Sequence, residues 1–105
     1  MTTDLLYTIQ TAAEDYAAAH VDEGKQRLYL AETEAEISAS LIGTPNPATG
    51  KEHSASSAEK AAKETPEIKR LRLELLDAER LTIIRRAALD CARIAAWADV
   101  ARFAA

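Results

Sequence analysis

Residues 43–66 read GTPNPATGKEHSASSAEKAAKETP and contain five of the six glycines and prolines in the 105-residue chain. Both residue types interrupt helices, because glycine loses much conformational freedom on folding and proline lacks an amide donor. The long stretches on either side are rich in Ala, Leu, Glu and Arg, which are good helix formers. The sequence therefore predicts an all-α fold, a long antiparallel helical hairpin, forming a single domain over residues 1–105.

We expect the first long helix at about residues 4–42 and the last at about 66–104. Gly43 followed by Pro45 is typical of a helix end, since glycine tolerates the left-handed conformation there. Pro66 suits the first position of the last helix.

The connection, residues 43–66, is expected to contain a short helix of its own. Ser56 and Glu59 have the spacing of a capping box, which predicts a helix at about residues 57–64 with Ser56 as its N-cap. The part before Ser56 is rich in turn-forming residues, so we expect ordered turns.

The last helix has apolar residues on two faces. The first seam consists of Ile68, Leu71, Leu75, Ala78, Thr82, Arg85, Leu89, Ala92, Ala96, Asp99 and Phe103. The second consists of Leu73, Leu76, Ile83, Ile84, Ala87, Cys91, Ile94, Ala98 and Ala101. One partner helix can cover only one seam. Arg72, Glu79, Arg86 and Arg93 recur every seven residues and are expected to mark the solvent side.

This surplus predicts self-association into a helical bundle, as a dimer or higher oligomer. The 23 alanines and the aromatic content of only 5% point the same way, because such a core buries little area. Trp97 is read as a core or interface residue, or alternatively as an exposed anchor for another protein. The expected interface residues are Ile84, Leu89, Cys91, Ile94, Trp97 and Phe103.

On the first helix, the expected packing stripe shifts to a neighbouring face after Tyr16. It consists of Leu6, Ile9, Ala13 and Tyr16, and then of Ala17, Val21, Gly24, Leu28, Ala31, Ala35, Ser38 and Ile42. The extra step of four residues is a stutter. Gly24 on this stripe suggests close packing against a partner, or a mild kink.

Charge is distributed unevenly. Residues 1–42 carry a net charge of −6 and residues 67–105 carry +2, within an overall charge of −4. Helices of opposite sign suit antiparallel pairing. The N-terminus lacks the pattern of a signal peptide, and no stretch approaches the ~20 apolar residues of a membrane span. With the single Cys91, these features predict a cytoplasmic location in a bacterial host cell.

No pattern indicates an enzyme, a cofactor or a metal site. His20 and His53 are far apart, and Cys91 lies on an apolar face, where a buried structural thiol is expected. Gly43 and Gly50-Lys51 resemble a phosphate-binding loop, but six residues separate the glycines instead of four.

Residues 46–71 resemble a segment of small helical proteins of tailed bacteriophages and prophages, with the pattern NP-x-TGK-x-HS-x-SSAE-x-AA before a long helix. The matching residues are Asn46, Pro47, Thr49, Gly50, Lys51, His53, Ser54, Ser56, Ser57, Ala58, Glu59, Ala61 and Ala62. The resemblance implies a phage accessory protein of undefined activity and transfers no catalytic residue.

We therefore expect a non-enzymatic phage or prophage accessory protein that binds itself and another protein. The loop end of the hairpin is the expected binding surface, through Asn46, Thr49, Lys51, His53, Ser54 and Lys60. One alternative is a nucleic-acid-binding accessory of phage DNA recombination, using Lys63, Lys69, Arg70 and Arg72 near the same end. The neighbouring glutamates and the lack of aromatic residues make that signal weak. A purely structural coiled-coil spacer is the other alternative.

Overall fold

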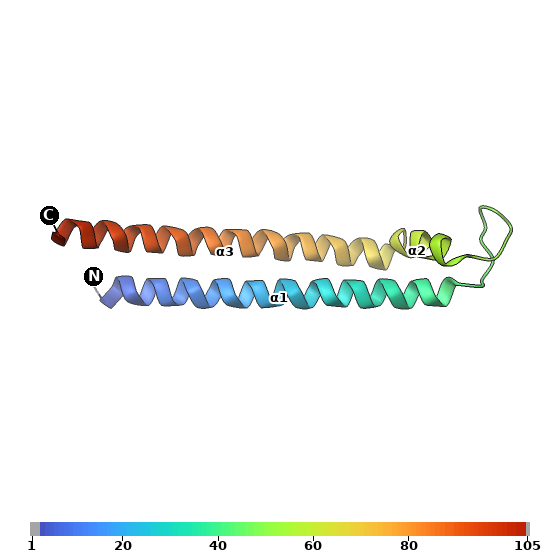
Figure 1. Ribbon diagram of the computed structural model, residues 1–105, viewed down its shortest axis with the longest axis horizontal. Helices are drawn as coiled ribbons and strands as arrows, with labels where there is room; N and C mark the ends of the chain where they lie inside the picture. Colours follow the sequence, from blue (N-terminus) through green and yellow to red (C-terminus); the bar gives the residue numbers. More distant parts are fainter. Residues whose placement is uncertain (1–2, 105) are drawn as a thin grey trace. The chain divides into compact units, whose positions relative to one another are not determined.

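The computed structural model describes residues 3–104, with side chains up to Arg102, and these residues form three helices (Figure 1). They are α1 (Thr3–Leu41), α2 (Ala55–Lys63) and α3 (Pro66–Ala104). The prediction of an all-α hairpin with a short helix in its connection is confirmed. The expected interface residue Phe103 has its side chain outside the described part.

The chain divides into two compact units. The terminal unit joins Met1–Gly24 with Asp77–Ala105, and the loop unit is Lys25–Leu76. Within each unit, a part of α1 lies side by side with a part of α3 and runs in the opposite direction (Figure 1). The loop unit also contains α2 and the residues that connect it to α1.

The face of α3 that packs on α1 is the first of the two seams expected from the sequence. Buried residues recur at steps of three, four or seven, at Ile68, Leu71, Ala78, Thr82, Leu89, Ala92 and Ala96, and the half-buried Leu75 divides the first step of seven. We call this set the inner seam. Arg85 has the right spacing but is exposed, since its charged group stays in water.

The packing face of α1 differs from the expected stripe. Its buried and half-buried residues keep an unbroken spacing of three and four, at Ile9, Ala12, Tyr16, Ala19, Glu23, Gln26, Leu30, Thr33 and Ile37. Val21 and Leu28, expected to pack, are exposed. Two helices in contact keep the same period on both sides, and the inner seam of α3 has no stutter, so α1 follows it through polar positions.

Small and polar residues bring the helices together in the terminal unit. The buried Thr82 hydroxyl lies 3.0 Å from the carbonyl oxygen of Ala78 and 3.3 Å from that of Ala19 on α1, and it can donate its proton to either. A buried hydroxyl needs such an acceptor. The opposing Ala19 is itself buried. This core is therefore thin.

The expected solvent stripe of α3 lies beside the inner seam rather than opposite to it. The Arg86 guanidinium lies 6.0 Å from the centroid of the Tyr16 ring on α1. Arg93 lines a cavity together with Ile9 of α1. Arg86 precedes the buried Leu89 by three residues, so the two share one side of the helix. The opposite side of α3 is apolar.

Gly24 has no packing role within the chain. A Cβ atom at this position would meet no atom within 4 Å, and the residue is exposed. The expectation that Gly24 allows close packing is therefore wrong for the single chain, because this face of α1 does not meet α3.

Replacing Leu89 with Asp tests the inner seam. Leu89 is 5% exposed, so Leu89→Asp should lower the free energy of unfolding by about 3 kcal/mol or more, through lost burial and an unpaired buried charge. The control Leu73→Asp changes a residue of the same helix that is 63% exposed, and should cost less than about 0.5 kcal/mol. Urea unfolding followed by circular dichroism measures both, and equal costs would contradict the assigned seam.

Candidate interaction surfaces

The loop between α1 and α2 is held by backbone hydrogen bonds. Pro45 and Glu52 form an isolated antiparallel bridge. Beside it, the amide of His53 donates to the carbonyl of Thr44 at 2.8 Å, and that of Asn46 donates to Lys51 at 2.7 Å. Gly43 and Gly50 have φ of 82° and 72°, a region that favours glycine. The loop therefore has a defined shape.

Two of the expected protein-binding residues stabilise the loop by accepting hydrogen bonds within it. The side-chain oxygen of Asn46 accepts a hydrogen bond from the amide of Ala48 at 3.0 Å, which is an Asx turn. The Thr49 hydroxyl oxygen accepts from the amide of Lys51 at 3.4 Å. Both polar groups are thus engaged within the loop.

His53 and Ser54 also belong to the framework. His53 is 8% exposed, and its Nδ1 lies 3.0 Å from the hydroxyl oxygen of Ser57. Ser54 is the N-cap of α2, since its side chain accepts from the amide of Ser57 at 3.2 Å. The expectation of Ser56 as N-cap is wrong, because the chain leaves the bridge at Glu52 and enters the helix two residues earlier. Four of the six expected loop contacts are exposed, namely Thr49, Lys51, Ser54 and Lys60. Of these, Lys51 and Lys60 are the two whose side chains are not used in the turn or the cap described above.

The basic residues near the loop are partly paired. Glu34 on α1 is half-buried, and its carboxylate oxygens lie 3.9 Å from Lys63 Nζ and 3.8 Å from a guanidinium nitrogen of Arg72. Lys69 and Arg70 are exposed. The carboxylate thus offsets part of the positive charge at this end of the hairpin.

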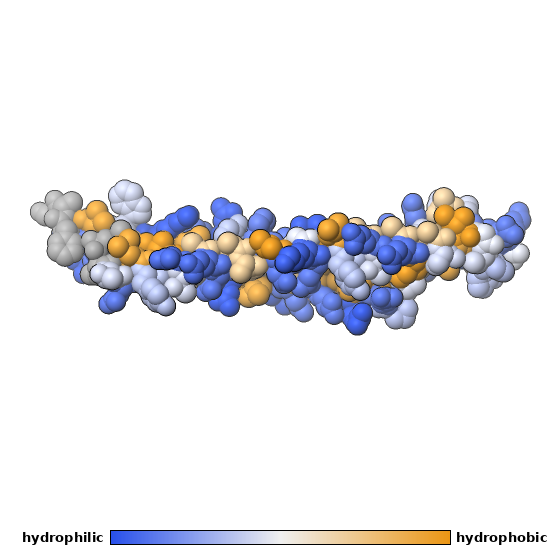
Figure 2. Space-filling model, turned by 90° about the horizontal axis from the view of Figure 1, so that it is seen from below, coloured by the Kyte–Doolittle hydropathy of each residue, from blue (hydrophilic) through white to orange (hydrophobic). Residues whose placement is uncertain are grey.

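The outer face of α3 in the terminal unit is apolar and exposed. Ile83 is 70% exposed and Ile94 is 67% exposed. Ile84 is exposed as well, and so is Cys91, whose thiol was expected to be buried. Leu89, expected on this interface, lies instead in the inner seam. It precedes Cys91 by two residues, which places it on the opposite side of the helix. Figure 2 looks from below Figure 1 onto the side of α1, where apolar side chains also lie at the surface among hydrophilic ones.

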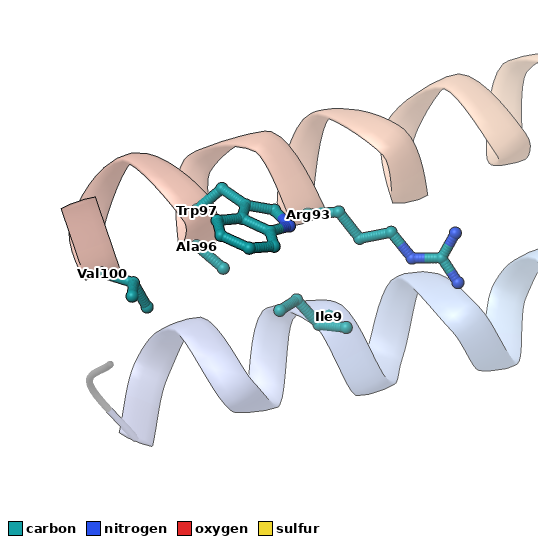
Figure 3. A pocket seen from close by; sticks show the side chains of 5 residues that line it. All are labelled: Ile9, Arg93, Ala96, Trp97 and Val100. Carbon is teal, nitrogen blue, oxygen red and sulfur yellow. The ribbon is translucent and has the colours of Figure 1, made fainter.

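Trp97 stands at the edge of this face. It is 74% exposed, so it is not a core residue of the chain. It lines a cavity of about 370 Å³ together with Ile9, Arg93, Ala96 and Val100. Figure 3 shows the indole lying along α3 and facing the side of Ile9 on α1. Because Trp97 follows Ile94 by three residues, the two are neighbours on the surface of α3, and the exposed indole extends the apolar surface there.

A second hollow lies in the loop unit, on the stripe of α1 that was expected to pack. Its volume is about 500 Å³, and its lining residues are Ala31, Glu34, Ala35, Ser38, Ala39, Ile42, Glu59 and Lys63. Small side chains on α1 make the floor, and charged side chains border it. The small residues Ala31, Ala35 and Ser38 of the expected stripe leave room for this hollow, whereas the sequence pattern predicts that they pack against α3.

Within residues 3–104, neither long helix has a stretch apolar enough to cross a membrane. In the same part of the chain, no three His, Cys, Asp or Glu side chains come together as metal ligands would. Comparison of the chain with protein-family models, curated proteins and solved structures finds no match.

Replacing Ser54 with Ala tests the assigned cap. Ser54→Ala removes the acceptor for the Ser57 amide and should destabilise α2 by about 1 kcal/mol. The matched control Ser56→Ala changes an exposed serine two residues away and should cost less than about 0.5 kcal/mol. Hydrogen exchange of the α2 amides reports the local cost, and faster exchange in Ser56→Ala than in Ser54→Ala would contradict the assignment.

Proposed function

We propose that this chain acts by binding protein through the outer faces of its helices, rather than by catalysing a reaction. The observation that carries the proposal is the exposed apolar face of α3 in the terminal unit, with Ile83, Ile84 and Ile94. A group of large apolar side chains exposed on one face of a helix typically marks an interaction site. The exposed Trp97 supports the same reading, because tryptophan is enriched in the residues that dominate binding energies.

The loop end provides a second contact surface in this proposal. Lys51 and Lys60 are exposed there on a loop and a short helix whose shapes are fixed by hydrogen bonds. A fixed loop loses little conformational entropy on binding. The support is weaker than for the outer face, because Asn46, Thr49 and Ser54 already use their side-chain oxygens within the chain.

The resemblance of residues 46–71 to small phage proteins supports the biological setting, that of a phage or prophage accessory protein. The proposed activity does not depend on that setting. A helical module that binds through its apolar faces has the same physical requirements in any cell.

An affinity experiment with matched variants tests the proposal. The immobilised full-length chain is incubated with bacterial lysate to which a tagged second copy has been added. We expect it to retain at least one protein, the tagged copy included, that Ile83→Glu/Ile94→Glu loses. The control Lys69→Glu introduces an acid at an exposed position of α3 in the loop unit, away from this face, and should keep the bound protein.

Two outcomes would contradict the proposal. One is that wild type and the double variant retain the same proteins. The other is that binding is lost only with Lys51→Ala/Lys60→Ala, which would place the binding surface at the loop end. Circular dichroism of each variant shows whether the helices are intact.

A further inference from the structure

Six apolar residues on α3 repeat the spacing of the inner seam on the opposite side of the helix. They are Ile84, Ala87, Cys91, Ile94, Ala98 and Ala101, and all six are exposed. We call them the outer strip. Ile84, Cys91, Ile94 and Ala98 each lie two residues after a member of the inner seam, which is about 200° around an α-helix. Ala87 and Ala101 continue the same spacing. The outer strip therefore faces away from α1 in the terminal unit.

We propose that the outer strip binds the same strip of a second copy, with the two α3 helices antiparallel. This inference rests on the proposed function and names the partner for its main surface. A strip with alternating steps of three and four residues is the pattern by which two helices pack along a common seam.

The sizes of the side chains favour the antiparallel order. With the two-fold axis between Cys91 and Ile94, Ile84 lies opposite Ala101 of the second copy, and Cys91 lies opposite Ile94. Every isoleucine then meets a small residue, and only the layers of Ala87 and Ala98 consist of alanine alone. A parallel pair would place each residue opposite itself, with isoleucine against isoleucine and with Ala87, Ala98 and Ala101 each forming an alanine layer, so its layers would be less even in volume.

The charges around the strip also suit a second copy. No charged residue lies within the strip, so two copies do not repel one another there. Arg80 lies four residues before Ile84, and Arg102 lies four residues after Ala98, so both flank the ends of the strip. Asp90, beside the strip, pairs with Arg93 at 4.0 Å. Between these ends, an identical strip of neutral side chains can lie against it without burying a charge.

The strip and its neighbour offer apolar area for a second copy to cover. Ile84 is 54% exposed, Ile94 is 67% exposed, and the adjacent Ile83 is 70% exposed. Burying apolar area stabilises association by about 25 cal/mol per Å².

Disulfide trapping tests both the partner and the orientation. The native thiol is first removed by Cys91→Ala, and Ala87→Cys and Ala98→Cys are then introduced together. In the antiparallel dimer, residue 87 of one copy lies opposite residue 98 of the other, so two cysteines meet only in the variant that carries both new cysteines. The two positions are 11 residues apart on one helix, about 16 Å, so they cannot bond within one chain. We expect the double-cysteine variant to run as a covalent dimer after mild oxidation.

The two single-cysteine variants in the same Cys91→Ala background are the controls. Each should stay non-covalent, because residue 87 faces residue 98 of the second copy. Linkage in the single variants would show a parallel pair and overturn the orientation. Light scattering of the wild-type chain at micromolar concentration should give twice the mass of 11.4 kDa.

The other outcomes separate this inference from the proposed function. A dimer by light scattering with no covalent link in the double variant would mean that another face associates, and it would overturn the strip as the interface. A monomer at 11.4 kDa would overturn the second copy as the partner. In that case, a protein retained by the wild-type chain and lost by Ile83→Glu/Ile94→Glu would still support the proposed function.

Discussion

Each long helix of a two-helix hairpin can cover only one face of the other, and this limit determines what the protein exposes. α3 packs its inner seam on α1, so that Leu71 and Leu89 are buried. Its other side carries Ile84 and Ile94, which are equally apolar and exposed. Exposed apolar area costs about 25 cal/mol per Å² relative to burial. Association through the outer side would therefore stabilise the chain by burying this area.

Because little apolar area is buried between the two helices, small residues and hydrogen bonds hold the helix contact and the loop. α1 meets α3 through alanines and polar residues, and the Thr82 hydroxyl lies near the carbonyl oxygen of Ala19 on α1. Such a contact lets the helices approach closely but buries little apolar area per residue. At the loop end, hydrogen bonds replace apolar burial: Asn46 and Ser54 use their side chains to shape the turn and to cap α2.

The sequence was sufficient for the bounds of the two long helices and for the inner seam of α3, because glycine, proline and apolar spacing are local signals. It placed the N-cap of α2 two residues too late. The face of α1 was not predictable in this way. After Tyr16, one stripe continues through the apolar Val21 and Leu28, and the other passes through Glu23 and Gln26. The unbroken period of α3 selects the second, which is apolar again at Leu30 and Ile37. The roles of the loop residues were hidden because turns and caps use the same polar side chains as binding sites do.

The dependence of thermal stability on protein concentration tests the central claim, that the outer side of α3 is buried against a second copy. Unfolding of a dimer releases two chains, so its midpoint temperature depends on concentration. We predict that the midpoint of the wild-type chain, followed by circular dichroism, rises steadily over a hundred-fold range of concentration. A midpoint that stays constant over that range would contradict the account.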